Sequence, residues 1–380
     1  MFSSIVSSLF GGISVGSVLL IAALGLAIVF GLMGVINMAH GELMTIGAYT
    51  TYVIQNLCKG TPLQDLYIFP ALIVAFFVVG ALGLLLEKFV VRNLYGRPLE
   101  TLLATWGVSL ILQQFVRSVS WQMTIGIAIF VLLFIGGNVI LRRFTGLSAL
   151  VRSILAAVYA AIAIGGSSIV GNASQPLARP WFGAQGVNLT APTWLLQGID
   201  IGGERLPATR IFIIFLTILC VAAVYFCLNQ TTWGLRIRAV TQNREMSACL
   251  GIPTQQVDAL TFALGSGLAG IAGVAITLLG STDPTAGSNY IIDAFMVVVI
   301  GGVGKLVGSI IAAMTLGVAN YLIAADVFSP LLSWVPPLAD FFKFFSNSSM
   351  AKVIVYSAIF IFLQVRPAGL FPQKGRTAEN

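Results

Sequence analysis

The sequence predicts an all-α, polytopic membrane protein: a helical bundle with about eleven membrane segments. Of its 380 residues, 58% are hydrophobic and only 9% are charged, and the mean hydropathy is +0.97. A soluble domain would carry about a quarter of charged residues. Most apolar runs approach the ~20 residues that a helix needs to cross a bilayer, which is too long for barrel strands.

The apolar runs define the expected membrane segments in order. They lie at about 9–33, 35–56, 66–91, 100–119, 122–141, 149–170, 209–229, 257–280, 290–304, 306–325 and 350–365. The run at 290–304 is short and ends in glycines, so it is a candidate half-helix or re-entrant segment. The first two runs are nearly continuous, which suggests that one of them is also broken.

Basic residues predict the orientation. With the N-terminus outside and eleven crossings, thirteen of the 20 Lys and Arg residues fall on one side. Cytoplasmic loops carry an excess of Lys and Arg. We therefore expect that side, which includes the C-terminus, to be cytoplasmic, and we attribute the net charge of +7 to topology rather than to nucleic-acid binding.

The whole chain, 1–380, is expected to form one transmembrane domain. Its parts are a first half (9–119), an inserted hairpin (121–170), an external loop with a small β-hairpin (171–208), a cytoplasmic loop (230–256) and a second half (257–365). The two halves are threaded in opposite directions, and each has a Gly-rich element near its second span. This arrangement is typical of an inverted repeat, whose interface usually holds a transport path.

A polar stretch interrupts the first half. Asn37, His40 (the only histidine) and Glu42 lie between apolar runs, where ionisable groups are costly and often functional. One interpretation is that they line or gate a path for a small polar solute. The other is that they brace a broken helix, with Glu42 favoured near a helix N-terminus by the helix dipole. The threading places this stretch near the cytoplasmic side unless a helix is interrupted.

Further path candidates lie on two other segments. Thr105, Ser109 and Gln113 share one helical face, where hydroxyl and carboxamide groups suit a neutral, amide-like solute or join neighbouring helices. Asp293 lies early in the short segment, where its carboxylate either faces a cavity or caps the N-terminus of the segment. No catalytic constellation and no metal-ligand spacing are evident, and a lone histidine is a poor metal site.

The cytoplasmic loop 230–256 contains a predicted short helix. Met246 and Leu250 are four residues apart and would share one face. Gly251 is expected to end this helix and Pro253 to prevent its continuation. Such a helix is either a docking surface or a solvated connector whose arginines only fix topology.

Five blocks resemble one family in order. They are NMAHGELMTIGAYTTYVIQ, ETLLATWGVSLILQQ, RAVTQNREMSACLGIPTQQVDALTFALGSGLAGIAG, NYIIDAFMVVVIGGVGKLVG and QVRPAGLFPQKGR. They look like the permease subunits of branched-chain amino-acid-type ABC importers, and the wording of ATWG-SLILQQ, AVTQNR and YIIDAFMVVV most resembles the urea-importer permease. The segments 121–170 and 330–348 are longer than the family pattern, which leaves span count and assembly open.

The resemblance implies a set of partners and a site. The partners would be a second homologous permease, two cytoplasmic ATPase subunits that bind ATP and Mg²⁺, and an external solute-binding protein. The assembly would lie in a bacterial inner membrane. This chain would itself hold no cofactor. Contact with the ATPase would lie at about 236–252, with the assigned residues Arg238, Gln242, Asn243, Arg244, Glu245, Met246, Leu250 and Gly251.

Three alternatives remain open. A branched-chain amino-acid or short-amide ABC permease has the same fold with another solute. A stand-alone urea channel or secondary transporter would need no ATPase. An intramembrane enzyme is disfavoured because the catalytic constellations are missing.

Overall fold

The computed structural model describes residues 2–142, 149–173, 179–182, 186–201, 204–332, 334 and 336–371. In these residues the chain is almost entirely helical, with a single two-stranded β-hairpin. Two compact units are distinguished: one runs up to Leu110 and resumes at Val187, and the other is Ile111–Gly186.

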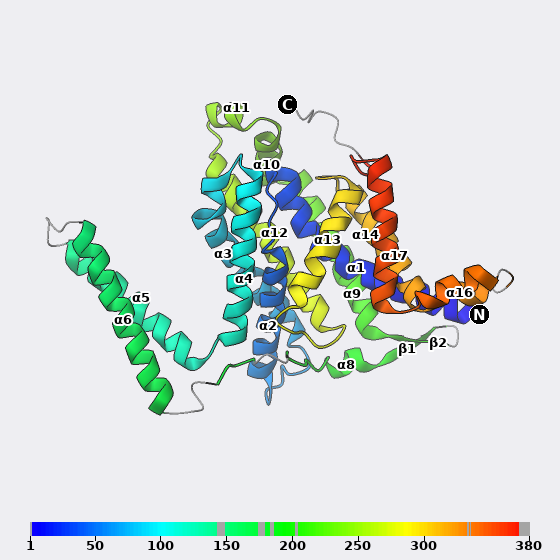
Figure 1. Ribbon diagram of the computed structural model, residues 1–380, viewed down its shortest axis with the longest axis horizontal. Helices are drawn as coiled ribbons and strands as arrows, with labels where there is room; N and C mark the ends of the chain where they lie inside the picture. Colours follow the sequence, from blue (N-terminus) through cyan, green and yellow to red (C-terminus); the bar gives the residue numbers. More distant parts are fainter. Residues whose placement is uncertain are drawn as a thin grey trace. The chain divides into compact units, whose positions relative to one another are not determined.

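The larger unit is a bundle of helices (Figure 1). Its elements are α1 (Phe2–Met33), α2 (His40–Cys58), α3 (Ile68–Phe89), η1 (Val91–Leu94), α4 (Pro98–Ser118) as far as Leu110, α8 (Thr193–Leu196), β1 (Gly198–Ile201), β2 (Glu204–Pro207), α9 (Ala208–Gln230), α10 (Thr232–Gln242), α11 (Arg244–Cys249), α12 (Thr254–Thr277), α13 (Ala286–Gly301), α14 (Leu306–Ala324), α15 (Phe328–Leu331), α16 (Pro336–Phe344) and α17 (Ser348–Val365).

The core of this unit is built on α1 and α12. The apolar stretch of α1 is largely buried, and so is that of α12, whereas α17 and α9 expose most of theirs, as expected for helices that face lipid. Helix α12 packs against α3, α2 and α1. Small residues allow this close approach, because a Cβ on Gly270 would lie 2.6 Å from the carbonyl oxygen of Ala75.

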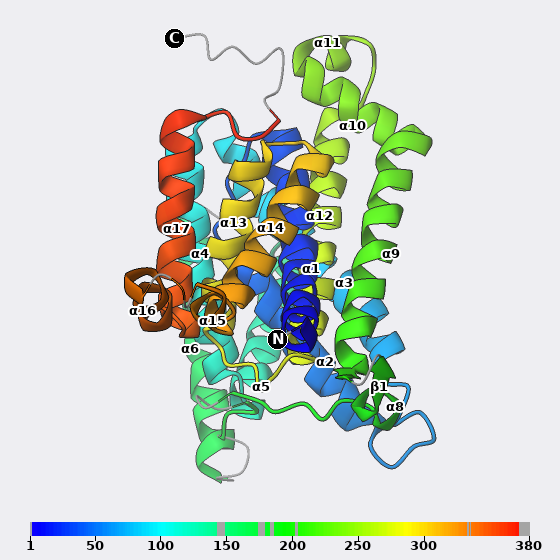
Figure 2. The same cartoon turned by 90° about the vertical axis from the view of Figure 1, so that its right-hand side faces the viewer.

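The bundle has two distinct ends (Figure 2). We call the end that carries α10 and α11 the α11 end, and the end that carries α8 and the β-hairpin the hairpin end. Helix α1 ends at the α11 end, where the Thr241 hydroxyl donates to the Leu32 carbonyl at 3.2 Å. Helix α10 lies over this end with Ile237 and Val240 packed against Val257.

The smaller unit contains a helical pair. Helices α5 (Trp121–Arg142) and α6 (Ala149–Ala173) pack against each other. A short extended pairing follows, in which Ser120 pairs with Pro180 and the Trp181 N–H donates to the Val119 carbonyl at 2.9 Å. The residues predicted as an inserted hairpin thus form most of this unit.

The number of membrane crossings stays a prediction. Seven helices in the described residues are long and apolar enough to cross a membrane, and Trp121–Leu132, Ser153–Gly166 and Ala286–Gly301 are shorter apolar helices. The small β-hairpin expected within 171–208 is present, with Gly198 paired to Pro207. The segment 326–349 contains α15 and α16.

Candidate functional site

The polar stretch that contains Asn37, His40 and Glu42 includes a break between α1 and α2. The chain turns at Gly34, which has φ +69°, and residues 35–37 are not helical. Helix α2 then begins at His40, whose Nε2 lies 3.0 Å from the carbonyl oxygen of Ala22. Ala22 lies eleven residues before Met33, which is about 16 Å along a helix. The chain therefore returns into the bundle before α2 starts.

The depth of this start is close to the middle of the bundle. A Cβ on Gly25 of α1 would meet both the His40 ring and the backbone of Gly265, and Gly265 is the central residue of the span α12. His40 is fully buried. From the sequence we expected this stretch near the cytoplasmic side unless a helix is interrupted. The helical course is interrupted between α1 and α2, and His40 lies near the middle of the bundle.

Two polar side chains hold the non-helical segment in place. The Thr105 hydroxyl accepts from the Met38 N–H at 3.1 Å and lies 3.3 Å from the Ile36 carbonyl oxygen. The Asn37 side chain accepts from the Ala39 N–H at 3.1 Å. Backbone groups at membrane depth must find partners within the protein. Asn37 and Thr105 therefore stabilise the segment between α1 and α2 by hydrogen bonding to its backbone.

A second break meets the first. Helix α12 ends at Thr277 and α13 begins only at Ala286. The Gly287 N–H donates to the Thr45 hydroxyl at 3.0 Å, and a Cβ on either Gly41 or Gly287 would collide with the carbonyl of the other. The N-termini of α2 and α13 thus touch inside the bundle.

The two helices leave this contact in opposite directions. Helix α2 runs toward the hairpin end, while α13 runs toward the α11 end beside α1, where Phe295 stacks on Phe30. Such discontinuous helices with positive N-terminal ends occur at the solute sites of many transporters. Here the glycine contact fills the space between them, so this point closes the bundle.

The predicted path residues fall into three places. Asn37, His40, Glu42 and Thr105 are buried around the break, and the Ser109 hydroxyl lies 3.4 Å from a Glu42 oxygen. The void beside Asn37 and Thr105 has no room for a water molecule. Gln113 lies in the smaller unit. Asp293 alone among these candidates lines a large cavity.

That cavity opens among α1, α13, α14 and α17 on the side of the hairpin end. Its volume is about 850 Å³. Asp293 lies at one wall, 2.8 Å from the Lys352 ammonium, and also accepts a hydrogen bond from the Tyr356 hydroxyl. The other polar residues that line the cavity are Asn289, Tyr290, Asn320, Tyr321, Ser348 and Ser349. We call it the outer cavity.

The loop 230–256 presents α11 at the end of the bundle. The Asn243 side chain caps the helix by accepting from the Met246 N–H at 2.9 Å. The helix ends at Cys249, one residue before the predicted Leu250, and Gly251 follows with φ +81°. Met246 is 58% and Leu250 75% exposed. The eight residues assigned to ATPase contact are all exposed.

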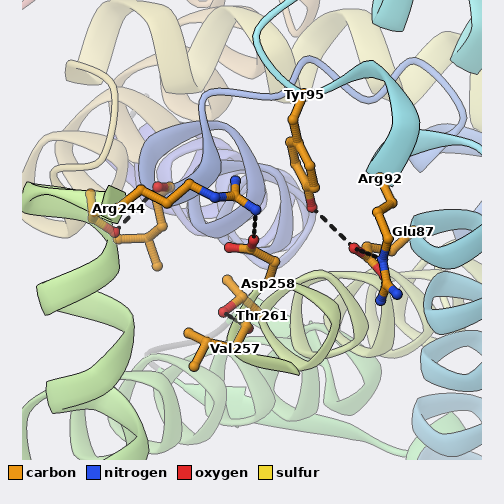
Figure 3. Close-up of polar contacts among 9 residues, drawn as sticks. Glu87, Arg92, Tyr95, Arg244, Val257, Asp258 and Thr261 are labelled. Atoms are coloured by element: carbon orange, nitrogen blue, oxygen red, sulfur yellow. Dashed lines mark hydrogen bonds and ion pairs between the residues drawn. The ribbon is translucent and has the colours of Figure 1, made fainter. Parts of the chain in front are cut away.

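Helix α11 is tied to the bundle through one arginine (Figure 3). Arg244 forms an ion pair with Asp258 of α12, with 2.5 Å between Nη2 and Oδ2. Its guanidinium also lies over the Tyr95 ring, 4.6 Å from the centroid. A cation over an aromatic face is attracted by the ring quadrupole. Arg244 therefore connects α11 with α12 and with the loop after η1.

The contacts continue from Tyr95 to α3. The Tyr95 hydroxyl donates to Glu87 at 3.3 Å, and Arg92 binds both oxygens of Glu87 at 3.2 and 2.9 Å. Burial, together with the nearby carboxylates of Asp258 and Glu87, raises the pKa of the Tyr95 phenol, so the phenol stays protonated. The hydrogen bond with Glu87 raises the pKa of Arg92. We call Glu87, Arg92, Tyr95, Arg244 and Asp258 the charge network.

The sequence predicted Asp293 of the outer cavity and Arg244 of the charge network as site residues, but not the side chains that they contact. Lys352 and Arg92 counted only among the basic residues that indicate orientation, and Glu87, Tyr95, Asp258 and Asn320 were not singled out. An acidic residue within an apolar run was the available signal, since Glu87 and Asp258 both lie near the ends of such runs. Nothing in the sequence indicated which cation pairs with which acid.

Comparison with known proteins gives one family. The family described as "Branched-chain amino acid transport system / permease component" matches residues 8–363. The branched-chain amino acid transport permease protein LivH of Salmonella typhimurium is 26% identical over 328 residues, covering 85% of this chain and 87% of the relative.

Two further relatives are also described as permease proteins. The corresponding permease protein BraD of Pseudomonas aeruginosa is 25% identical over 369 residues, covering 95% of this chain and 94% of the relative. The ribose import permease protein RbsC of Escherichia coli is 29% identical over 148 residues, or 37% of this chain and 40% of the relative. No solved structure matches the chain significantly.

Proposed function

The chain belongs to the family of branched-chain amino acid transport system permease components, and on this premise we propose how it works within its importer. It is a multi-pass membrane permease of ABC-type transport, and therefore a transport subunit and not an enzyme. Its partners would be a second homologous permease, two ATPase subunits that bind ATP and Mg²⁺, and an external solute-binding protein, in a bacterial inner membrane.

The observation that carries the mechanism is the anchored, exposed α11. Met246 and Leu250 present apolar side chains to solvent at the end of the bundle, which suits a groove on an ATPase. Arg244 on the same helix is bound to Asp258 and Tyr95. A push on α11 by a closing ATPase would thus act directly on α12 and, through Tyr95 and Glu87, on α3.

The transmitted force would reach the centre of the bundle. Helix α12 packs against α3, α2 and α1, so a displacement of its α11 end would be felt where α2 and α13 meet. This motion would alternate the access of the path between the two membrane faces, as in other transporters with discontinuous helices. ATP hydrolysis itself would occur in the partners.

The docking role is tested by charge insertion. Met246→Asp and Leu250→Asp place a carboxylate in the contact with the ATPase, and each should weaken ATPase co-purification or uncouple hydrolysis from uptake. Thr61→Asp inserts the same charge at an exposed residue just after α2, outside the assigned contact, and serves as the control. Normal co-purification and coupling in both Met246→Asp and Leu250→Asp would refute the docking role.

The orientation follows from the same proposal. The α11 end would be cytoplasmic and the hairpin end external, with the N-terminus outside. The native cysteines allow a test without substitutions, because Cys249 on α11 is exposed and Cys58 ends α2 at the other end. In spheroplasts an impermeant maleimide should label Cys58 and should label Cys249 only after permeabilisation. The reverse pattern would invert the topology.

Urea is the solute that we propose. The support is the resemblance of residues 104–114, 239–244 and 290–299 to the urea-importer permease. Branched-chain amino acids are the second candidate, supported by relatives whose names give that solute at 25–26% identity. Both are small enough for the outer cavity.

Uptake in the complete importer separates the two solutes. Cells that express this chain with its partner permease, ATPases and binding protein should accumulate labelled urea and not labelled leucine. Leucine uptake without urea uptake would overturn the choice of urea. Urea flux through the purified chain alone in liposomes would instead indicate a channel and would overturn the ATP-driven mechanism.

A further inference from the structure

We propose that the outer cavity is a solute-binding site and that its chemistry selects a small, uncharged solute with amide-type hydrogen bonding. The inference rests on the proposed function as a permease, because it assumes that solute arrives from the hairpin end. It goes further by assigning contact residues on α13 and α14 and by giving the reason why charge is not required of the solute.

The first observation is an unused acceptor. The carboxamide oxygen Oδ1 of Asn320 is buried and has no hydrogen-bond donor among the described residues, although it belongs to a residue that lines the outer cavity. Buried polar atoms nearly always have a partner. An N–H group of a bound solute would supply the missing donor.

The second observation concerns charge. Asp293 and Lys352 are the charged residues that line the outer cavity, and they neutralise each other at 2.8 Å. The Tyr356 hydroxyl donates a further hydrogen bond to Asp293. The carboxylate is thus already satisfied by two donors from α17, so the two charged residues that line the cavity compensate each other.

The remaining polar groups have the chemistry of an amide site. Asn289 and Asn320 offer carboxamides from α13 and α14, and Tyr290 and Tyr321 offer phenol groups. Carboxamides and hydroxyls both donate and accept. They match the carbonyl acceptor and the N–H donors of a urea-like solute.

The third observation is that the cavity ends at these residues. Asp293, Asn320 and Lys352 also line a second void of about 10 Å³ that is otherwise bounded mainly by Leu19, Met296, Leu316 and Val355. Only a single water molecule would fit in such a space. The polar groups therefore form the floor of the outer cavity, because the void behind them is too small for a solute, and a solute would stop at this floor.

The test measures occupancy directly rather than transport. Ser349 lines the outer cavity and is exposed, so the Ser349→Cys variant, in a chain with Cys58→Ser and Cys249→Ser, provides a thiol at the site. In the reconstituted importer, urea should slow the reaction of this thiol with a small methanethiosulfonate. At a urea concentration of twice Kd, the rate should fall about threefold.

Matched variants give the specificity. Thr61→Cys places a thiol on an exposed residue outside the cavity, and its reaction rate should not respond to urea. Asn320→Leu removes the unused acceptor at similar volume and should abolish the protection that urea gives to the thiol of the Ser349→Cys variant. Asn289→Leu, at an exposed position that should not affect folding, should reduce this protection as well.

The charge argument has its own variant. Replacing Asp293 by Asn together with Lys352 by Met removes both charges and should leave the protection by urea within about twofold, because a neutral solute needs neither. Loss of protection in this double variant, or protection by leucine and not by urea in the parent, would overturn the assignment to a neutral solute.

The outcomes separate this inference from the proposed function. If urea does not slow the labelling of the Ser349→Cys thiol in an importer that accumulates urea, the outer cavity is not a binding site. The permease function would still stand in that case. Protection by urea in an assembly that does not couple uptake to ATP would support the site while removing the ATP-driven mechanism.

Discussion

Replacing Arg244 should weaken the attachment of α11 to the bundle, and the free-energy cost can be derived from the burial of the ion pair that is lost. In Arg244→Met, Asp258, with a side chain only 6% exposed, would lose its cation. Breaking a fully buried ion pair costs about 3–5 kcal/mol and an exposed one about 0–1 kcal/mol. The Arg244 side chain is 44% exposed, so the pair belongs between these limits. Together with the contact to the Tyr95 ring, we expect a cost of about 1–2 kcal/mol.

Hydrogen exchange measures this cost where it arises. A loss of about 1–2 kcal/mol corresponds to about a 5–30-fold change in a population ratio, so the amides of α11 should lose protection by that factor. The ATP hydrolysed per solute imported should rise in parallel. The control is Arg97→Met, which breaks the exposed pair between Arg97 and Glu100, 66% and 54% exposed, and should change neither quantity. Equal effects of the two variants would refute the role given to Arg244.

Three other predictions follow from the packing. Gly287→Ala should destabilise the chain by about 1–3 kcal/mol in a detergent melt, because its Cβ would collide with Gly41, whereas Gly107→Ala, with open space around it, should be neutral or stabilising. Thr105→Val should cost about 1–3 kcal/mol by leaving the Met38 N–H unpaired, and Thr105→Ser should retain most of this stability. Burial raises the pKa of Tyr67 from 10.0 to about 12, so the stability from its neutral form should be complete below pH 10 and lost as the pH rises toward 12; Tyr67→Phe should melt without this alkaline step.

Composition and apolar run length predicted the class of fold but not the depth at which α2 begins. The near-continuous runs 9–33 and 35–56 indicated that one of them is broken but not where, because residues 34–39 are themselves mostly apolar. The backbone of this non-helical segment is bound by a hydroxyl on another helix, that of Thr105. A contact between residues 67 positions apart leaves no periodic signal in the sequence.

The local features of the candidate site were predictable from the sequence, but the contacts between its helices were not. The exposed face of α11 was predictable from Met246, Leu250 and the terminating Gly251, since these are local signals. The pairings of Arg244 with Asp258 and of Asp293 with Lys352 were not, because each joins two helices whose relative rotation is set by packing. The polar face of Thr105, Ser109 and Gln113 was identified correctly as a helical face, yet Thr105 braces backbone and Ser109 contacts Glu42. Gln113 belongs to the smaller unit.

The contact between Gly41 and Gly287 also determines which helices can slide. Separating α2 from α13 would break the buried bond from the Gly287 N–H to Thr45, and an unsatisfied backbone group at membrane depth costs several kcal/mol. We therefore expect α2 and α13 to move together when α12 is displaced. Helices α14 and α17 pack beside α13 and bear Asn320 and Lys352. Opening a passage past the floor of the outer cavity should then let α14 and α17 shear along α13.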